Sequence, residues 1–239
     1  MGHRYARLGL SAPPPRLYLH AMVLQDGPLS GVRVDYLSSA LDEASMAPTW
    51  WQQLSGWLAD AVEAELPEPT AMVLATADIE GRPSSRTVLC KAIDARGVVF
   101  CTNYTSNKSH DLWATRYACA TFPWIALHRQ AHVRGSAERV PPEESALYWR
   151  ARPREAQLGA WASTQSRVVP SRRALDNAFE GVRRRFADVE HVPVPPHWGG
   201  VLVRPDTVEF WCGRASRMHD RLRFRIDVDR QWHLERLAP

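Results

Sequence analysis

The sequence predicts a mainly β protein with peripheral helices, folded as a closed or split antiparallel β-barrel. Short apolar segments typical of strands follow one another between residues 71 and 237. Most of them are separated by connections too short for a parallel crossover, so the strands are expected to be antiparallel. Segments with apolar residues three or four positions apart lie between them and predict helices at the periphery of the barrel.

The first expected element is an amphipathic helix from about 48 to 64, in which Trp50, Leu54 and Trp57 recur at helical spacing. Pro67 ends it. Three apolar segments joined by tight turns then predict an antiparallel meander. Its strands are expected at 71–76, 85–92 and 98–102.

Further helices and strands are expected in the rest of the chain. Ser106 is the expected N-cap of a helix to about residue 114, and Pro141 and Pro142 open another to about Arg150. Gly135 indicates a bulge within a long strand. A fourth helix is expected from about 171 to 186, with a solvated arginine face at 183–185. The remaining strands are expected at 118–124, 129–140, 199–203, 208–211, 221–226 and 232–237.

The bulk composition is that of a soluble globular protein. Of 239 residues, 45% are hydrophobic and 23% are charged, and no apolar run approaches the length of a membrane span. The net charge of +4 fits an anionic small ligand as well as it fits nucleic acid. Residues 1–45, rich in proline and arginine, are expected to be a partly disordered extension of a domain at 46–239.

The cysteines indicate a reducing compartment. Cys90, Cys101, Cys119 and Cys212 form no C-x-x-C pair and lie in apolar, strand-like surroundings. Zinc or redox-dithiol spacing is therefore lacking, so we expect thiols, a cytoplasmic protein and no metal site.

A motif near the C-terminus concentrates charge. Residues 211–221 contain three arginines, a histidine and a tryptophan. In an extended segment Arg217, His219 and Arg221 would share one face, where their mutual repulsion calls for an anion or an electron-rich ring. The alternative is a solvated basic hairpin.

Three further clusters could bind anions. Arg86 and Lys91 lie on opposite faces of one expected strand, where each could bind a different anion. The alternative is that they are edge-strand cations that discourage aggregation. Residues 102–108 place hydroxyls, amides and a lysine at a helix N-terminus, as in a phosphate pocket, or simply as an N-cap. Tyr148 and Arg152 would share a helix face and could bind phosphate, or the arginine could stack on an aromatic ring. Together the clusters predict two phosphorylated ligands, one of them an aromatic cofactor.

From about Trp50 to its end the chain resembles the pyridoxamine 5'-phosphate oxidase family, the FMN enzymes that make pyridoxal 5'-phosphate. Several ordered motifs support this resemblance. They are Arg86-Thr-Val-Leu-Cys-Lys91, Phe122-Pro-Trp124, Arg129-Gln130, Arg152-Pro-Arg154, Gln157-Leu-Gly-Ala-Trp161, Gln165-Ser166, Trp198-Gly-Gly200, Glu209-Phe-Trp211 through Arg217-Met-His-Asp-Arg221, and Arg236-Leu-Ala-Pro239.

The resemblance implies an FMN-binding split-barrel oxidase domain at 46–239 and a homodimer with FMN at the subunit interface. A dimerisation and active-site segment would cover about 196–239. The implied reaction, part of vitamin B6 biosynthesis and salvage, oxidises pyridoxamine or pyridoxine 5'-phosphate with O2 to pyridoxal 5'-phosphate and H2O2.

The resemblance also implies site residues. The implied FMN contacts are Arg86, Thr87, Val88, Leu89, Lys91, Cys101, Thr102, Lys108, Gln130, Gln165, Ser166, Trp211 and Arg221. The implied substrate contacts are Lys91, Tyr148, Arg152, Arg217 and His219, of which Arg217 and His219 would be catalytic.

Three positions depart from the family pattern. Cys101 replaces an aromatic residue, Asn107 an arginine and Ala156 a serine. A lost neutral hydrogen bond costs about 1 kcal/mol and a charge-assisted one about 1.5–3 kcal/mol, which predicts weaker binding rather than a different reaction.

Three alternatives stay open from the sequence. The first is a related split-barrel flavoenzyme that acts on a phenazine precursor or uses a deazaflavin. The second is a flavin or pyridoxal-phosphate carrier without catalysis. The third is a nucleic-acid-binding barrel, for which the chain offers no ordered strip of aromatic and basic residues.

Overall fold

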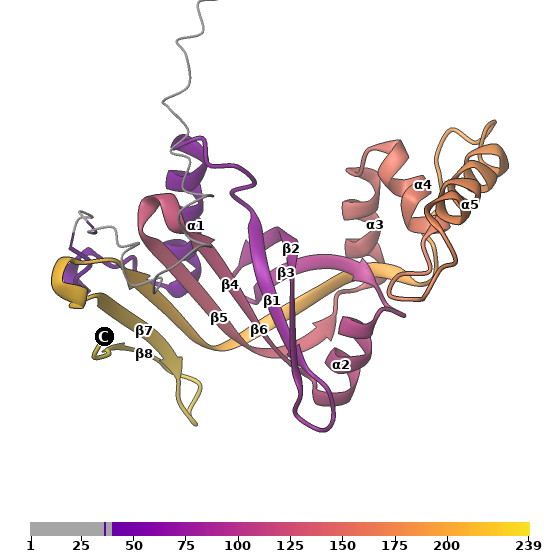
Figure 1. Ribbon diagram of the computed structural model, residues 1–239. Helices are drawn as coiled ribbons and strands as arrows, with labels where there is room; N and C mark the ends of the chain where they lie inside the picture. Colours follow the sequence, from indigo (N-terminus) through magenta and orange to yellow (C-terminus); the bar gives the residue numbers. More distant parts are fainter. Residues whose placement is uncertain (1–35, 37–39) are drawn as a thin grey trace, which may run out of the picture. The chain divides into compact units, whose positions relative to one another are not determined.

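The computed structural model describes Tyr36 and residues 40–239 (Figure 1). In this part of the chain the strands are β1 (Ala71–Ala77), β2 (Pro83–Asp94), β3 (Gly97–Asn103), β4 (Tyr117–Trp124), β5 (Arg129–Arg139), β6 (Trp198–Cys212), β7 (Asp220–Ile226) and β8 (Trp232–Arg236). The helices are α1 (Trp50–Glu63), α2 (Asn107–Thr115), α3 (Pro142–Arg150), α4 (Arg154–Ala162) and α5 (Arg172–Arg185). Most of the expected 1–45 extension lies outside the described residues; of its remainder, Glu43–Ser45 form a 3-10 turn capped by Asp42.

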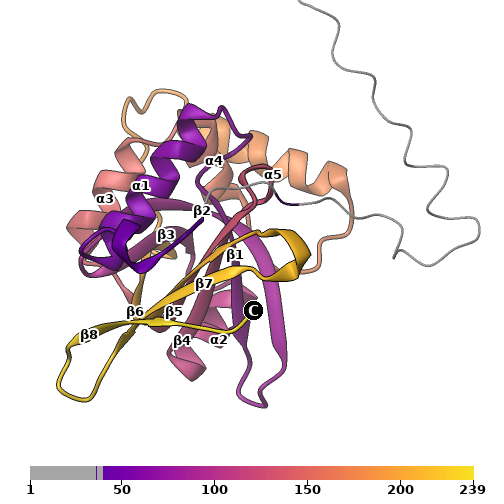
Figure 2. The ribbon, with the colours of Figure 1, turned by 90° about the vertical axis from the view of Figure 1, so that its left-hand side faces the viewer.

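The strands form a closed barrel with a hairpin attached. Their order is β3-β2-β1-β4-β5-β6-β7-β8, and an additional pairing of β3 with β6 closes the first six strands into a barrel. All of the pairings are antiparallel, as expected. Strands β7 and β8 continue the sheet beyond β6, away from the helices α3–α5, which gather on the other side of the barrel (Figures 1 and 2). The predicted mainly β barrel with peripheral helices is therefore confirmed.

The core fills the barrel and continues under α1. Large side chains such as Leu74, Phe100 and Phe122 are fully buried inside the barrel. The apolar stripe of α1 joins them, with the Trp57 ring centroid 5.1 Å from that of Phe210. Burial of whole aromatic side chains is the largest favourable contribution that such a core makes, at about 1.5–3 kcal/mol each. This packing fixes the barrel on which the polar cavity described below is built.

Some elements differ from the sequence-based expectation. The segments expected at 199–203 and 208–211 are one strand, β6. The register shifts beside Pro205: Arg134 pairs with Thr207 and Gly135 with Pro205, so Asp206 is the extra residue. The bulge therefore lies in β6 opposite Gly135, and not in the strand of Gly135 as predicted. The helix α4 was not expected at all.

The C-terminal motif is not extended. Cys212 pairs with Asp220, so the chain between them must reverse. A 3-10 turn at Ala215–Arg217 makes this reversal, with φ of 55° at Ser216 and 61° at Arg217. Arg217, His219 and Arg221 therefore do not share one strand face, and the expectation of an extended cationic row is wrong.

Candidate active site

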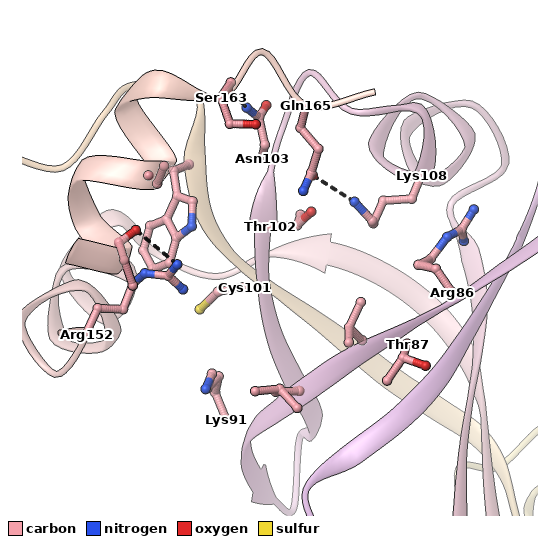
Figure 3. Close-up of a pocket in the computed structure, with 16 residues that line it drawn as sticks. Arg86, Thr87, Lys91, Cys101, Thr102, Asn103, Lys108, Arg152, Ser163 and Gln165 are labelled. Carbon is pink, nitrogen blue, oxygen red and sulfur yellow. Dashed lines mark hydrogen bonds between the residues drawn. The ribbon is translucent and has the colours of Figure 1, made fainter. Parts of the chain in front are cut away.

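A cavity of about 530 Å³ lies between the barrel and the α3–α4 region (Figure 3). It collects ten of the residues predicted from the sequence. They are Arg86, Thr87, Val88, Leu89 and Lys91 from β2, Cys101 and Thr102 from β3, and Lys108, Arg152 and Gln165. Strand β2 pairs with β1 over residues 83–89 and with β3 only from Cys90 to Asp94, so at Arg86 its other side has no strand partner among the described residues. The alternative that Arg86 and Lys91 protect a sheet edge therefore stays open beside the anion site.

One end of the cavity holds Arg86 and Lys108. The guanidinium of Arg86 donates to neutral oxygens, at 2.8 Å to Thr76 Oγ1 and at 2.6 Å to Ser84 Oγ. Burial lowers the pKa of Arg86. The Lys108 Nζ donates to Gln165 Oε1 at 2.8 Å. Both cations donate to neutral oxygens, and the one carboxylate among the described residues that acts on Arg86 is Asp111, which accepts from Thr76 Oγ1 at 2.6 Å. Two cations against one carboxylate leave a net positive charge that suits an anion.

Burial also changes the titration of Lys108. Its side chain lies in the first turn of α2 and is buried. Desolvation, and then the positive charge of Arg86, lower the pKa of Lys108 to about 8. An anion in this place would remove both causes, because it both pairs with the ammonium and offsets the neighbouring guanidinium.

The start of α2 is arranged to face the same end of the cavity. Ser106 is the N-cap as predicted, but its hydroxyl makes no capping hydrogen bond and donates instead to Asn103 O at 2.8 Å. The Asn107 N–H donates to Ser166 Oγ at 3.2 Å. Ser166 is therefore next to the cavity without being one of the side chains that line it.

The other end of the cavity holds Lys91 and Arg152. The Arg152 Nη2 donates to Ala156 O at 3.2 Å, and its guanidinium lies 5.4 Å from the Trp198 ring centroid, so the predicted alternative of stacking on an aromatic ring is observed. Its Nε is buried without a hydrogen-bond partner among the described residues. Such a donor is rare in native proteins and indicates a missing acceptor. Burial raises the pKa of the nearby Cys101 thiol to about 11, against the opposing charges of Lys91 and Arg152.

Tyr148 lies beside the cavity and not on its wall. Its hydroxyl donates to Glu144 Oε1 at 3.0 Å. Helix α3 ends at Arg150, so Tyr148 and Arg152 do not share a helix face as expected. The hydrogen bond to Glu144 raises the pKa of Tyr148, after the larger effect of desolvation.

A second cluster holds four of the remaining predicted residues, Gln130, Trp211, His219 and Arg221, and the fifth, Arg217, is exposed in the turn that precedes His219. None of them lines the cavity. Trp211 pairs with Gln130 on β5 and with Arg221 on β7, and its ring centroid lies 4.7 Å from that of His219. The guanidinium of Arg221 makes a two-point ion pair with Glu209, at 2.7 and 3.0 Å. The charge of this arginine is therefore already balanced by a carboxylate inside the chain.

The two clusters are separated along one strand. Trp198 lines the cavity at the start of the 15-residue β6, and Trp211 stands near its end. At roughly 3.3 Å per residue they lie about 40 Å apart along the strand. The structure thus divides the predicted site into two halves.

Sequence reasoning named Asn103 only as part of the polar stretch 102–108, and it gave no role to Ser163 or Tyr36. Asn103 and Ser163 line the cavity, and the Asn103 Nδ2 donates to Ser163 O at 3.4 Å. Tyr36 packs edge-on against Trp211 and His219, with centroids 5.8 and 5.6 Å away. Its sequence position, far upstream of the motif, gave no signal.

Comparison with known proteins identifies the family. The model described as "Pyridoxamine 5'-phosphate oxidase" matches residues 58–186, and that described as "Pyridoxine 5'-phosphate oxidase C-terminal dimerisation region" matches residues 198–239. The pyridoxine/pyridoxamine 5'-phosphate oxidase of Saccharopolyspora erythraea is 61% identical over 212 residues, 88% of this chain and 95% of that protein. That of Nocardia farcinica is 51% identical over 222 residues, 88% of this chain and 98% of that protein.

Among solved structures, PhzG from Burkholderia lata 383 in complex with tetrahydrophenazine-1-carboxylic acid has a TM-score of 0.78 at 32% identity, covering 84% of this chain and 99% of that one. Within the described residues, no helix has the length and apolar character needed to cross a membrane. On the match of both models and the identity to the curated relatives, the chain is an oxidoreductase that belongs to the pyridoxamine 5'-phosphate oxidase family.

Proposed function

We propose that the protein oxidises pyridoxamine 5'-phosphate and pyridoxine 5'-phosphate to pyridoxal 5'-phosphate, using FMN and O2 and releasing H2O2. The names of relatives up to 61% identical support this activity. The main structural support is one cavity with two separate pairs of cations, Arg86 with Lys108 and Lys91 with Arg152. Two such pairs suit a phosphorylated cofactor and a phosphorylated substrate.

The residues present fit FMN. A cavity of about 530 Å³ lies within the range of roughly 300–1,000 Å³ typical of small-molecule sites. Arg86 and Lys108 would hold the FMN phosphate, and Gln165 and the β2 backbone would hold the rest. Bound there, FMN supplies the hydride acceptor and the route for electrons to O2.

Lys91 and Arg152 would hold the substrate phosphate. The unpaired Nε of Arg152 would gain an acceptor from it. Fixing the phosphate orients the substrate ring over the reacting group. Such positioning lowers the activation barrier by several kcal/mol, with an upper limit on the order of 7–11 kcal/mol. The oxidised amine then hydrolyses to the aldehyde and ammonia.

Arg217 and His219 would act at the reacting carbon. The guanidinium stabilises developing negative charge, and the imidazole orients the substrate ring or moves a proton. The His219 Nδ1 accepts the Arg214 N–H at 3.1 Å, so Nε2 is the nitrogen that is left for this work. These are catalytic roles because both groups would touch the substrate.

A homodimer would complete the site. One chain holds its two half-sites at opposite ends of β6, and an isologous dimer can bring the Trp211 end of one subunit to the cavity of the other. The match of residues 198–239 to a dimerisation region supports this arrangement. FMN would then lie at the subunit interface.

The free thiols of Cys90, Cys101 and Cys119 agree with the proposed location in the cytoplasm.

The alternative with a phenazine precursor is favoured by one observation, the similarity to PhzG. The curated relatives named as pyridoxine/pyridoxamine 5'-phosphate oxidases are nearer in sequence, at 61% against 32% identity. The cations Lys91 and Arg152 also suit a phosphate better than a ring carboxylate, because together they offer several donors to its three oxygens.

The direct test is a visible absorbance spectrum of the purified protein, followed by addition of pyridoxamine 5'-phosphate under air with peroxide detection. We expect flavin bands, then aldehyde and peroxide in equal amounts. Flavin without turnover would favour the related flavoenzymes or a carrier. Failure to bind added FMN would refute the proposal.

The shared site has its own test. Arg152→Gln and His219→Ala each damage a different half-site and should each be inactive. After the two variants are unfolded and refolded together, half of the dimers pair unlike subunits, with one intact site of two. We expect about a quarter of wild-type activity to return. No recovery in proven mixed dimers would place both halves in one subunit.

A further inference from the structure

The hydroxyl of Tyr148 is held by a fixed carboxylate. It donates to Glu144 Oε1 at 3.0 Å. The same carboxylate receives both terminal nitrogens of Arg96, at 2.9 Å to Oε2 and 3.0 Å to Oε1. Arg96 is itself anchored to Asp94, with Nη2 to Oδ2 at 2.8 Å. The turn between β2 and β3 thus fixes Glu144 in place.

Tyr148 is close to the half of the cavity that the proposed function gives to the substrate phosphate. Its ring packs in one apolar cluster with Cys101 and Trp198, both of which line the cavity. Arg152, four residues further along the chain, has an unpaired buried Nε on the same cavity wall. A phosphate held by Arg152 would therefore be next to the Tyr148 hydroxyl.

A tyrosine hydroxyl has a single proton to donate. While Tyr148 donates it to Glu144, it cannot donate it to a phosphate, and the carboxylate is also an anion that repels one. We infer that Glu144 is a positioning residue that competes with the substrate phosphate for the Tyr148 hydroxyl proton, and so limits the affinity for phosphorylated ligands. The inference rests on the function proposed above.

The test is the binding of pyridoxal 5'-phosphate to the FMN-loaded protein, measured by calorimetry. Glu144→Gln keeps the shape of the side chain and removes its charge, so we expect binding about fivefold tighter. The KM for pyridoxamine 5'-phosphate should fall by the same factor while kcat stays unchanged. Pyridoxal, which lacks the phosphate, should bind as it does to the wild type.

Two controls separate competition from other effects. Glu143→Gln removes a charge from the same turn of α3 at an exposed position and should change nothing. In a Tyr148→Phe background, Glu144→Gln should no longer tighten binding. If Glu144→Gln folds poorly, Glu144→Asp serves instead, because it keeps the charge but withdraws the carboxylate from Tyr148 and should also tighten binding.

The outcomes are distinct. Weaker or unchanged binding of pyridoxal 5'-phosphate by the Glu144 variants would overturn the inference, as would equal tightening by Glu143→Gln or toward pyridoxal. Tightening that persists without the Tyr148 hydroxyl would overturn it too. A wild-type holoenzyme that does not bind pyridoxal 5'-phosphate at all would refute the proposed function, and the inference with it.

Discussion

The lowered pKa of Lys108 predicts how FMN affinity depends on pH. Burial and the charge of Arg86 bring this pKa to about 8 in the free protein. A phosphate monoester is a dianion above its second pKa of about 6, so between pH 7 and 9 the lysine is the partner that titrates. Only its protonated form pairs with the phosphate, and FMN affinity should therefore fall as the pH rises through 8.

The size of the effect follows from the fraction protonated. With a pKa of about 8, nearly all Lys108 side chains are charged at pH 7 and about a tenth at pH 9, so the apparent Kd should rise about tenfold. Folding should respond in the opposite direction. In the unfolded chain the lysine titrates at its ordinary pKa of 10.5, so the free protein should gain stability between pH 8 and 10.5.

The assay is a titration of the apoprotein with FMN at pH 7, 8 and 9, followed by quenching of flavin fluorescence. Lys108→Arg is the matched variant, because a guanidinium keeps its charge over this range and its affinity should be independent of pH. Lys108→Gln should bind weakly at every pH. A tenfold slope that survives in Lys108→Arg would refute the assignment of the slope to this residue.

Three further predictions concern other parts of the chain. Arg217→Ala and His219→Ala should lower turnover at least about 100-fold, while FMN occupancy, read from absorbance, stays near that of the wild type. If turnover and FMN occupancy fell equally, these residues would have no role in the chemical step. Glu209→Gln should loosen the Arg221 guanidinium and weaken FMN binding about tenfold, measured by the same fluorescence titration, and unchanged affinity would contradict a role for this pair. Gly135→Ala should lower the free energy of unfolding, measured with denaturant, by about 2 kcal/mol, because its Cβ would collide with the backbone of β6. An unchanged free energy of unfolding would mean that the two strands can move apart at the bulge without cost.

The sequence predicted most of the fold because its signals are local. Alternating apolar residues and tight turns define β1–β3 without reference to the rest of the chain. The split of β6 and the missing α4 both come from weak sequence signals. The apolar pattern of β6 is interrupted at 204–207, where the register shift leaves Asp206 without a register partner on β5. Helix α4 has nine residues and buries only Leu158, so it leaves almost no periodic pattern.

The site was predictable in its residue types and not in its pairings. Lys108 and Gln165 are 57 residues apart, and only the folded chain shows that they meet. Arg221 pairs with Glu209 through strand register, which no motif records. The contact of Tyr148 with Glu144 is different, because a spacing of four on a helix brings side chains together and the sequence alone could have revealed it.

At two of the positions that depart from the family pattern, the contacts seen in the structure come from the backbone and do not depend on the side chain. At position 156 the backbone carbonyl, which any residue supplies, accepts from Arg152 at 3.2 Å. At position 107 the backbone N–H, again independent of the side chain, donates to Ser166 Oγ. A change of side chain at either position therefore leaves these backbone contacts in place. What Asn107 and Ala156 lack is the side-chain donor that the family pattern implies. Weaker phosphate binding stays the prediction for Asn107 and Ala156.

Strand β6 gives a physical reason for the proposed dependence of catalysis on the dimer. Because it is unbroken from Trp198 to Cys212, it holds the cavity and the Trp211–His219 cluster at a fixed separation. About 40 Å of strand separates them, and no movement of side chains shortens a β-strand. A single subunit would therefore keep the cations Arg86 and Lys108 and bind phosphate, yet lack Arg217 and His219 at the same cavity. Dissociation should abolish turnover before it abolishes affinity for the phosphate of FMN.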